Sequence, residues 1–179
     1  MQLKIGDSLI ELTQGDITRQ QVDAIVNAAN SQLAGGGGVD GAIHADGGPE
    51  IMAETEKLYP QGCPTGKAVA STAGLLPARF VFHAVGPIWR GGHKSERALL
   101  SSAHVECLNL AVEHDCRSIA FPALSTGAYG FPIDLAAEAA LEAVREFLER
   151  EQRPALVRFV LFSEGAFGAF ARVLESYAG

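Results

Sequence analysis

The sequence has few cysteines, fewer basic than acidic residues, and no long hydrophobic run. Its three cysteines are Cys63, Cys107 and Cys116; they lie far apart with no C-x-x-C pair, which argues against a disulfide framework or a zinc knuckle. The chain has 14 Lys and Arg against 21 Asp and Glu, a formal net charge of −7, so a surface for nucleic acid or anionic membrane is not expected. No apolar run approaches the roughly 18 residues of a membrane span, and no signal peptide is recognisable. These features favour a reduced, cytoplasmic protein.

What the sequence does contain is the composition of a soluble protein with a sizeable core. Its 179 residues are 47% hydrophobic and 20% charged, which predicts a single domain over residues 1–179. Strands are predicted at residues 3–12 (two short strands), 23–28, 67–73, 79–85, 117–124 and 156–162, and helices at 40–45, 49–58, 95–114, 133–150 and 167–177. This alternation predicts an α/β fold with helices on both faces of a mixed, mostly parallel sheet. The apolar pattern of the helix at 133–150 predicts that Leu135 faces inward, and Cys107 and Cys116 are interpreted as small core residues.

One stretch organises the chain: an apolar strand, then Asn30, then four consecutive glycines, Gly35 to Gly38, before Val39 and Asp40. Glycines bury no side chain and cost backbone entropy, but they leave peptide N–H groups bare. Bare N–H groups at a helix start, after the carboxyl end of a strand, bind phosphate readily. We therefore expect this stretch to hold a diphosphate and to place Asp40 and Asn30 beside the bond that is broken.

A second glycine-rich loop, Ser125 to Gly130, also follows a predicted strand and precedes a predicted helix. Parallel strands bring their carboxyl ends to one edge of the sheet, where ligands bind. Two such loops could hold the two phosphates of a pyrophosphate between them. The amide of Asn30 suits ribose hydroxyls, and Tyr129 or Phe162 could stack on a base or ribose.

Three familiar nucleotide and hydrolase motifs fit the sequence poorly. Residues 36–41 match G-x-G-x-x-G, but the glycines begin too long after the strand for a dinucleotide-binding turn. Residues 62–67 are one residue short of a P-loop and lack the Ser or Thr that binds magnesium. Residues 123–127 lack the first glycine of a nucleophile elbow, so Ser125 is a poor acyl-enzyme candidate.

The five histidines show no metal-ligand spacing, and no metal site is predicted. His83 lies in an apolar strand and is interpreted as a core histidine, whereas His93, His104 and His114 are expected at the surface. His44 follows Asp40 by one helical turn and so points to the same side. It either packs beneath the loop or acts directly in the chemistry. Asp16 could simply cap a short helix that follows it.

Several segments together resemble the macrodomain family, and its MacroD-type branch in particular. They cover essentially the whole chain in the family's order. The segments are Gly15-Asp-Ile-Thr18, Asp23-Ala-Ile-Val-Asn-Ala-Ala-Asn30, Gly35-Gly-Gly-Gly-Val-Asp-Gly-Ala-Ile-His44, Cys63-Pro-Thr-Gly66, His83-Ala-Val-Gly-Pro87 and Ser125-Thr-Gly-Ala-Tyr-Gly-Phe-Pro132. The resemblance implies a three-layer α/β/α sandwich that binds ADP-ribose.

The resemblance also implies roles for individual residues. Asp16 would accept from the adenine amino group with Ile17 beside it, and Phe162 would face the adenine. The implied ligand-binding set is Asp16, Ile17, Asn30, Gly37, Gly38, Val39, Asp40, Ser125, Thr126, Gly127, Ala128, Tyr129 and Phe162, and the catalytic candidates are Asp40, Asn30 and His44. Tyr129 stands where relatives have Phe or Tyr.

The activity implied by this branch is hydrolysis without a metal or other cofactor. Its substrates are O-acetyl-ADP-ribose and proteins that carry mono-ADP-ribose esterified to Asp or Glu. Either Asp40 acts as the general base, or the substrate's own phosphate polarises the water while Asp40 and Asn30 position the ribose. A monomer is expected. The alternative is a module that binds ADP-ribose without hydrolysing it, and the presence of both Asn30 and Asp40 favours the enzyme.

Overall fold

The computed structural model describes all 179 residues as seven strands and five α-helices, with one 3₁₀ turn, η1 (Ile17–Arg19). The strands are β1 (Gln2–Ile5), β2 (Ser8–Gln14), β3 (Ala24–Ala28), β4 (Ala68–Thr72), β5 (Phe80–Ala84), β6 (Ser118–Phe121) and β7 (Leu156–Leu161). The helices are α1 (Gly38–Gly47), α2 (Glu50–Leu58), α3 (Glu96–Glu113), α4 (Ile133–Glu151) and α5 (Glu164–Ala178). The predicted alternation of strand and helix is confirmed.

All seven strands form one sheet in the order β1-β2-β7-β6-β3-β5-β4. The inner five, β2, β7, β6, β3 and β5, run parallel, while β1 and β4 pair antiparallel at the two edges. The carboxyl ends of the five parallel strands therefore lie along one edge of the sheet. The loops that leave this edge include every segment that the sequence associates with a ligand.

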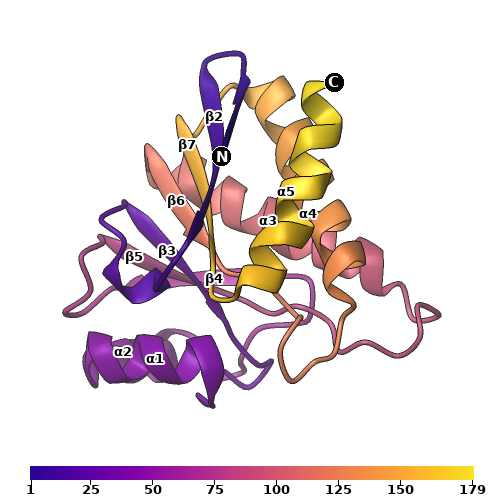
Figure 1. Ribbon diagram of the computed structural model, residues 1–179. Coiled ribbons are helices and arrows are strands. Elements are labelled where there is room, and N and C mark those ends of the chain that lie inside the picture. Colours follow the sequence, from indigo (N-terminus) through magenta and orange to yellow (C-terminus); the bar gives the residue numbers. More distant parts are fainter.

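Helices cover both faces of the sheet, with α1 and α2 on one face and α3, α4 and α5 on the other (Figure 1). On the first face, Ile25, Ile43 and Ile51 belong to a buried cluster of ten residues, the smaller of the two main hydrophobic clusters. On the second, the larger cluster joins Phe121 and Phe159 to the apolar faces of the three helices. This is the three-layer α/β/α arrangement that the resemblance implies. No helix is long and apolar enough to cross a membrane.

Two helices begin earlier than their apolar pattern indicates. α1 starts at Gly38 and not at Asp40, so the last of the four glycines is already helical. α5 starts at Glu164 and not at 167, because the hydroxyl of Ser163 caps it by accepting from the Ala166 N–H over 3.1 Å. Near residue 16, the expected short helix is only the 3₁₀ turn η1.

Two expectations about burial are wrong. His104 is not at the surface but 1% exposed, because α3 packs it against Phe121 with the ring centroids 5.1 Å apart. Leu135 was expected to face inward but is 40% exposed. It lies in the first turn of α4, on the side that also carries the exposed Glu138 and Glu142. By contrast, His83, Cys107 and Cys116 are buried as predicted.

Candidate functional site

The segments predicted to bind a ligand all follow the carboxyl ends of parallel strands. Asp16 and Ile17 follow β2, Phe162 follows β7, the loop Ser125–Tyr129 follows β6, and Asn30 with the glycine loop follows β3. They come from strands that are neighbours in the sheet, although they are far apart in the chain. The predicted meeting of the two glycine-rich loops at one sheet edge is consistent with this topology.

β3 and β6 separate before they reach this edge. Their pairing is limited to Ala24 with Ile119 and Ile25 with Ala120, so the last three residues of β3 pair only with β5. β6 continues along β7 on its other side. The chain after β3 turns into α1 on one face, and the chain after β6 leads to α4 on the other. Such a switch point is where open α/β sheets bind ligands.

The first glycine loop presents a run of backbone N–H groups that have no partner. The N–H groups of Gly35, Gly36 and Gly37 make no hydrogen bond in the protein. The next three, of residues 38–40, form the first turn of α1 and have no partner within the helix. Gly38 has φ of +57°, a left-handed conformation that favours glycine. The loop therefore offers several adjacent donors at a helix N-terminus, as an anion requires.

Asn30 shapes this loop from within. Its Nδ2 donates to the Gly35 carbonyl over 2.9 Å, and its Oδ1 accepts from the Ala34 N–H over 3.0 Å. Both ends of the amide thus hold residues 34–35 in place. Each end keeps capacity for one more hydrogen bond, so a second contact, to a ribose hydroxyl, is compatible with these two. The role of Asn30 in chemistry stays a prediction.

The second loop has the same property. The N–H groups of Ser125, Gly127, Ala128 and Tyr129 make no hydrogen bond within the protein. The turn is closed by Phe131, which donates from its N–H to the Ser125 carbonyl over 2.9 Å. Ser125 has φ of +67°, and its buried Oγ has no partner. Four unpaired donors in one short turn form a second place for an anion.

A third segment, residues 86–94 after β5, supports the second loop, although no residue of this segment is in the ligand-binding set expected from the sequence. The Trp89 N–H donates to the Tyr129 carbonyl over 2.8 Å. The segment is held in turn by Glu96, whose carboxylate accepts from the backbone N–H groups of Arg90, Gly92 and Lys94. Burial of Glu96 would raise its pKa, but these N–H donors together lower it to about 2. The signal in the sequence was the pair Gly91-Gly92 shortly before a glutamate at a helix start.

Asp40 is 5% exposed and lies in the first turn of α1. The N-cap position belongs to Gly37, so Asp40 does not cap the helix through its side chain. Its Oδ1 accepts from Asn27 Nδ2 over 2.8 Å and lies 3.2 Å from His44 Nε2. Its Oδ2 makes no hydrogen bond in the protein and lies 3.6 Å from where a Cβ on Gly36 would be. One oxygen is therefore held and the other faces the glycine loop.

His44 does lie on the same side of α1 as Asp40, as its spacing predicts. Its side chain is 18% exposed, and its buried Nδ1 has no partner. With the proton on Nε2, the ring donates to Asp40 and leaves only an acceptor unpaired, which costs less than an unpaired donor. The geometry suits a residue that orients Asp40, and a direct part in the reaction stays a prediction.

The residues implied for the adenine lie at the ends of β2 and β7. Asp16 caps η1: its Oδ1 accepts from the Thr18 hydroxyl over 2.7 Å and from the Thr18 N–H over 2.9 Å. These two bonds, the hydroxyl's first, lower the pKa of Asp16. Oδ2 faces only Arg19, at 3.7 Å. Ile17 is buried, whereas Phe162 is 88% exposed, an unusual position for a large aromatic ring.

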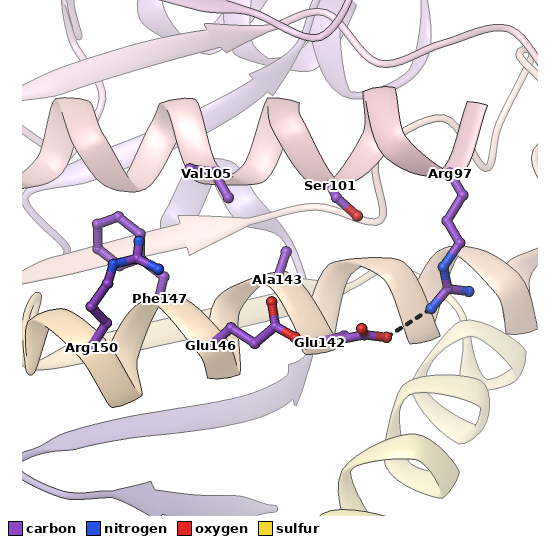
Figure 2. Close-up of a pocket in the computed structure, with 8 residues that line it drawn as sticks. All are labelled: Arg97, Ser101, Val105, Glu142, Ala143, Glu146, Phe147 and Arg150. Atoms are coloured by element: carbon purple, nitrogen blue, oxygen red, sulfur yellow. Dashed lines mark hydrogen bonds and ion pairs between the residues drawn. The ribbon is translucent and has the colours of Figure 1, made fainter. Parts of the chain in front are cut away.

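A separate cavity of about 140 Å³ lies between α3 and α4 in the helical layer (Figure 2). Two of its charged side chains, Arg97 and Glu142, form an ion pair at 2.8 Å. It is lined by none of the residues that the sequence associates with a ligand. No group of three or more His, Cys, Asp or Glu side chains is arranged to hold a metal ion.

The profile of the Macro domain family matches residues 26–140, which include both glycine-rich loops. The chain belongs to this family. An O-acetyl-ADP-ribose deacetylase of Escherichia fergusonii is 50% identical to this chain over 169 residues.

 The match spans 93% of this chain and 96% of that deacetylase.

Two solved macrodomain structures share the fold closely. The Oceanobacillus iheyensis macrodomain with ADP superposes with a TM-score of 0.94 at 39% identity, covering 99% of this chain and 96% of that one. The Trypanosoma brucei macrodomain in complex with ADP-ribose superposes with a TM-score of 0.85 at 38% identity, covering 92% of this chain and 68% of that one. The macrodomain resemblance and the α/β/α fold expected from the sequence are therefore confirmed.

Proposed function

We propose that this macrodomain binds ADP-ribose between its two glycine-rich loops and hydrolyses esters at the distal ribose. The substrates are O-acetyl-ADP-ribose and proteins with mono-ADP-ribose esterified to Asp or Glu. The observation that carries the proposal is the set of unpaired N–H groups in both loops, together with the buried carboxylate of Asp40 that faces the first loop. The name of the Escherichia fergusonii relative and the ADP-ribose bound by the Trypanosoma brucei macrodomain support the same ligand.

Backbone donors explain how an acidic protein can bind a diphosphate. The chain has a formal net charge of −7, and none of the two loops' residues is Lys or Arg. In place of side-chain cations, the loops supply N–H groups and the positive end of the α1 dipole. Because both loops are turns held by internal hydrogen bonds, their donors are oriented before the ligand arrives. Phe162 and Asp16, at the ends of β7 and β2, take the adenine.

The reaction needs only water and the ester. Water adds to the ester, the bond to the ribose oxygen breaks, and the products are a carboxylic acid and a free ribose hydroxyl. Asp40 Oδ2, which has no partner in the protein, accepts the proton of the attacking water as a general base. In the other arrangement, a phosphate oxygen of the substrate polarises the water, and Asp40 with Asn30 positions the ribose. Both arrangements use the same binding site.

The direct test is to incubate the purified protein with O-acetyl-ADP-ribose and, separately, with a protein ADP-ribosylated on glutamate. Release of ADP-ribose, measured by chromatography in the presence of EDTA, is the expected result. In water enriched in ¹⁸O, attack at the acetyl carbonyl places the label in acetate, whereas attack at the ribose carbon places it in ADP-ribose. If ADP-ribose is released from neither substrate, the proposed hydrolase function is contradicted.

The alternative is a module that binds ADP-ribose without turnover. The observation that favours this binding module is the geometry of Asn30, because both ends of its amide already form hydrogen bonds that hold the first loop. Calorimetry with ADP-ribose separates the two functions. Binding accompanied by no release would establish the binding module, and absence of binding would contradict both functions.

A further inference from the structure

Behind Asp40, a chain of buried polar side chains crosses three strands. Asn27 Nδ2, on β3, donates to Asp40 Oδ1 over 2.8 Å and lies 3.1 Å from His83 Nδ1, on β5. His83 Nε2 lies 2.8 Å from the Ser71 hydroxyl, on β4. Asn27, His83 and Ser71 are each at most 4% exposed. The chain thus runs from the edge strand to the candidate catalytic carboxylate.

This polar chain replaces apolar contacts on an otherwise apolar surface. Asn27 follows Ile25 by two residues on β3, and His83 follows Val81 by two on β5, so each pair shares one face of the sheet. Ile25 and Val81 belong to the smaller hydrophobic cluster under α1 and α2. Toward the carboxyl ends of the strands, the same face therefore changes from apolar to polar. Buried polar groups are costly unless they are paired, and these are paired with each other.

The donor and acceptor roles along this row of polar side chains can be assigned by starting from Ser71. The Ser71 hydroxyl donates to the Thr72 carbonyl over 2.9 Å, so it can only accept from His83. His83 then carries its proton on Nε2, and its Nδ1 accepts from Asn27. Burial, and secondarily the neighbouring His44, lowers the pKa of His83 to about 3, which agrees with a neutral ring.

Asn27 uses its two amide protons on two different acceptors. One goes to His83 Nδ1 and the other to Asp40 Oδ1. Its own Oδ1 is buried without a partner. If the amide were reversed, its oxygen would face the Asp40 carboxylate and two acceptors would oppose each other. The Asp40 carboxylate and the Nε2–H tautomer of His83, whose Nδ1 is then an acceptor, therefore favour the same orientation of the Asn27 amide.

We propose that Asn27, oriented by His83 and Ser71, is a positioning residue that fixes Asp40 Oδ1 and leaves Oδ2 as the oxygen that meets water. This rests on the proposed hydrolase function. His44 is the second donor to Oδ1, at 3.2 Å, so that oxygen is held from two sides. Asp40 then cannot rotate its carboxylate when the substrate binds, and Oδ2 stays directed toward the glycine loop.

The first test compares two serine variants. Ser71→Ala removes the acceptor that selects the His83 tautomer, and we expect kcat to fall about threefold or more. The KM and the ADP-ribose Kd should stay within about twofold, because the loop N–H groups are untouched. Ser71→Thr keeps the hydroxyl and should restore kcat. Ser8→Ala is the matched control: Ser8 is also a buried strand serine that donates to a backbone carbonyl, but at the amino end of β2.

The second test uses Asn27→Asp, which keeps the side-chain size but replaces the donor by an acceptor. We expect kcat to fall roughly 10²-fold with ADP-ribose binding retained. Histidine ¹⁵N NMR gives a readout independent of activity: His83 should be neutral with its proton on Nε2, and Ser71→Ala should reduce the share of that tautomer. A His83 proton on Nδ1 in the wild-type protein would overturn the assigned direction.

The outcomes separate this inference from the function on which it rests. No turnover by the wild-type protein would overturn both. Wild-type turnover with an unchanged kcat in both Asn27→Asp and Ser71→Ala would overturn the positioning role alone. Ser71→Ala could instead lower kcat and weaken ADP-ribose binding together, with neither restored by Ser71→Thr. That result would show that the buried polar side chains serve only the stability of the fold, and it would contradict the positioning role.

Discussion

The hydroxyl oxygen of Ser125 lies against the Cα of Gly86, in the space that a Cβ at position 86 would occupy. The loop after β5 and the loop after β6 are thus in contact where they leave the sheet. Trp89 reinforces this contact by its hydrogen bond to the Tyr129 carbonyl. The second glycine-rich loop is therefore shaped by a neighbour that precedes it by about forty residues of sequence.

Gly86→Ala should displace Ser125 and with it the unpaired N–H groups of the second loop. We expect the Kd for ADP-ribose, measured by calorimetry, to rise about tenfold, since a misplaced donor loses most of a charge-assisted hydrogen bond. Gly165→Ala is the control, because a Cβ there meets nothing within 4 Å. Unchanged affinity in Gly86→Ala would show that the contact does not determine the loop.

Asp40→Asn keeps the shape of the side chain but removes the carboxylate that can accept a proton. If Asp40 is the general base, kcat should fall by roughly 10²-fold or more while ADP-ribose still binds. The measurement is ester hydrolysis alongside calorimetry with ADP-ribose. Turnover near the wild-type rate would instead point to the substrate's phosphate as the group that polarises water.

Phe162→Ala should weaken ADP-ribose binding without destabilising the protein. The ring is 88% exposed, so its removal leaves no cavity, but loss of stacking on the adenine should raise the Kd about tenfold. Leu75→Ala is the matched control, because Leu75 is 83% exposed and lies in a different loop. Equal effects of the two substitutions would remove Phe162 from the adenine site.

The two buried histidines should make the protein less stable in acid. Burial, the largest cause for both, lowers the pKa of His83 to about 3 and that of His104 to about 4, below the ordinary histidine pKa of about 6.5. Between the lowered pKa values of the folded protein and about pH 6.5, the unfolded chain binds more protons than the folded one. The free energy of unfolding is therefore highest above about pH 6.5 and falls as the pH drops below it. At pH 5 each histidine should cost about 2 kcal/mol of unfolding free energy.

Urea titrations at pH 7 and pH 5 measure this loss. His104→Leu should flatten the dependence on pH by removing one of the two titrating groups, since His104 contacts only core residues and the Leu100 carbonyl. An unchanged slope in His104→Leu would mean that His104 does not titrate on unfolding in this range.

Glu96→Gln should loosen the segment from Arg90 to Lys94. The glutamine keeps one acceptor oxygen for the three N–H groups that now share a carboxylate, and it lacks the charge that strengthens those bonds. We expect faster amide hydrogen exchange at Gly92 and Lys94 and a modest, about threefold, rise in the Kd for ADP-ribose through Trp89. No change in exchange would contradict the role of Glu96 in holding the segment.

The local features of the fold could be predicted because they depend on neighbours in sequence. Four consecutive glycines leave N–H groups bare wherever they occur, and the one-turn spacing of Asp40 and His44 puts both side chains on one side of α1. The starts of α1 and α5 were predicted too late, because the apolar pattern gives no signal at a helical glycine such as Gly38 or at a capping serine such as Ser163. Leu135 was misplaced for a related reason, since the edge of an apolar stripe is decided by what packs beside it.

The sequence by itself determined the α/β alternation, both glycine-rich loops, and Asp40 as the residue on which the chemistry is proposed to depend. Only the tertiary structure decided how these parts are held. The parallel register of β3 and β5 places Asn27 beside His83, 56 residues later, and the antiparallel pairing of β4 brings Ser71 to the same ring. Contacts of this kind leave no periodic trace in the chain, because strand register arises from the packing of the whole sheet.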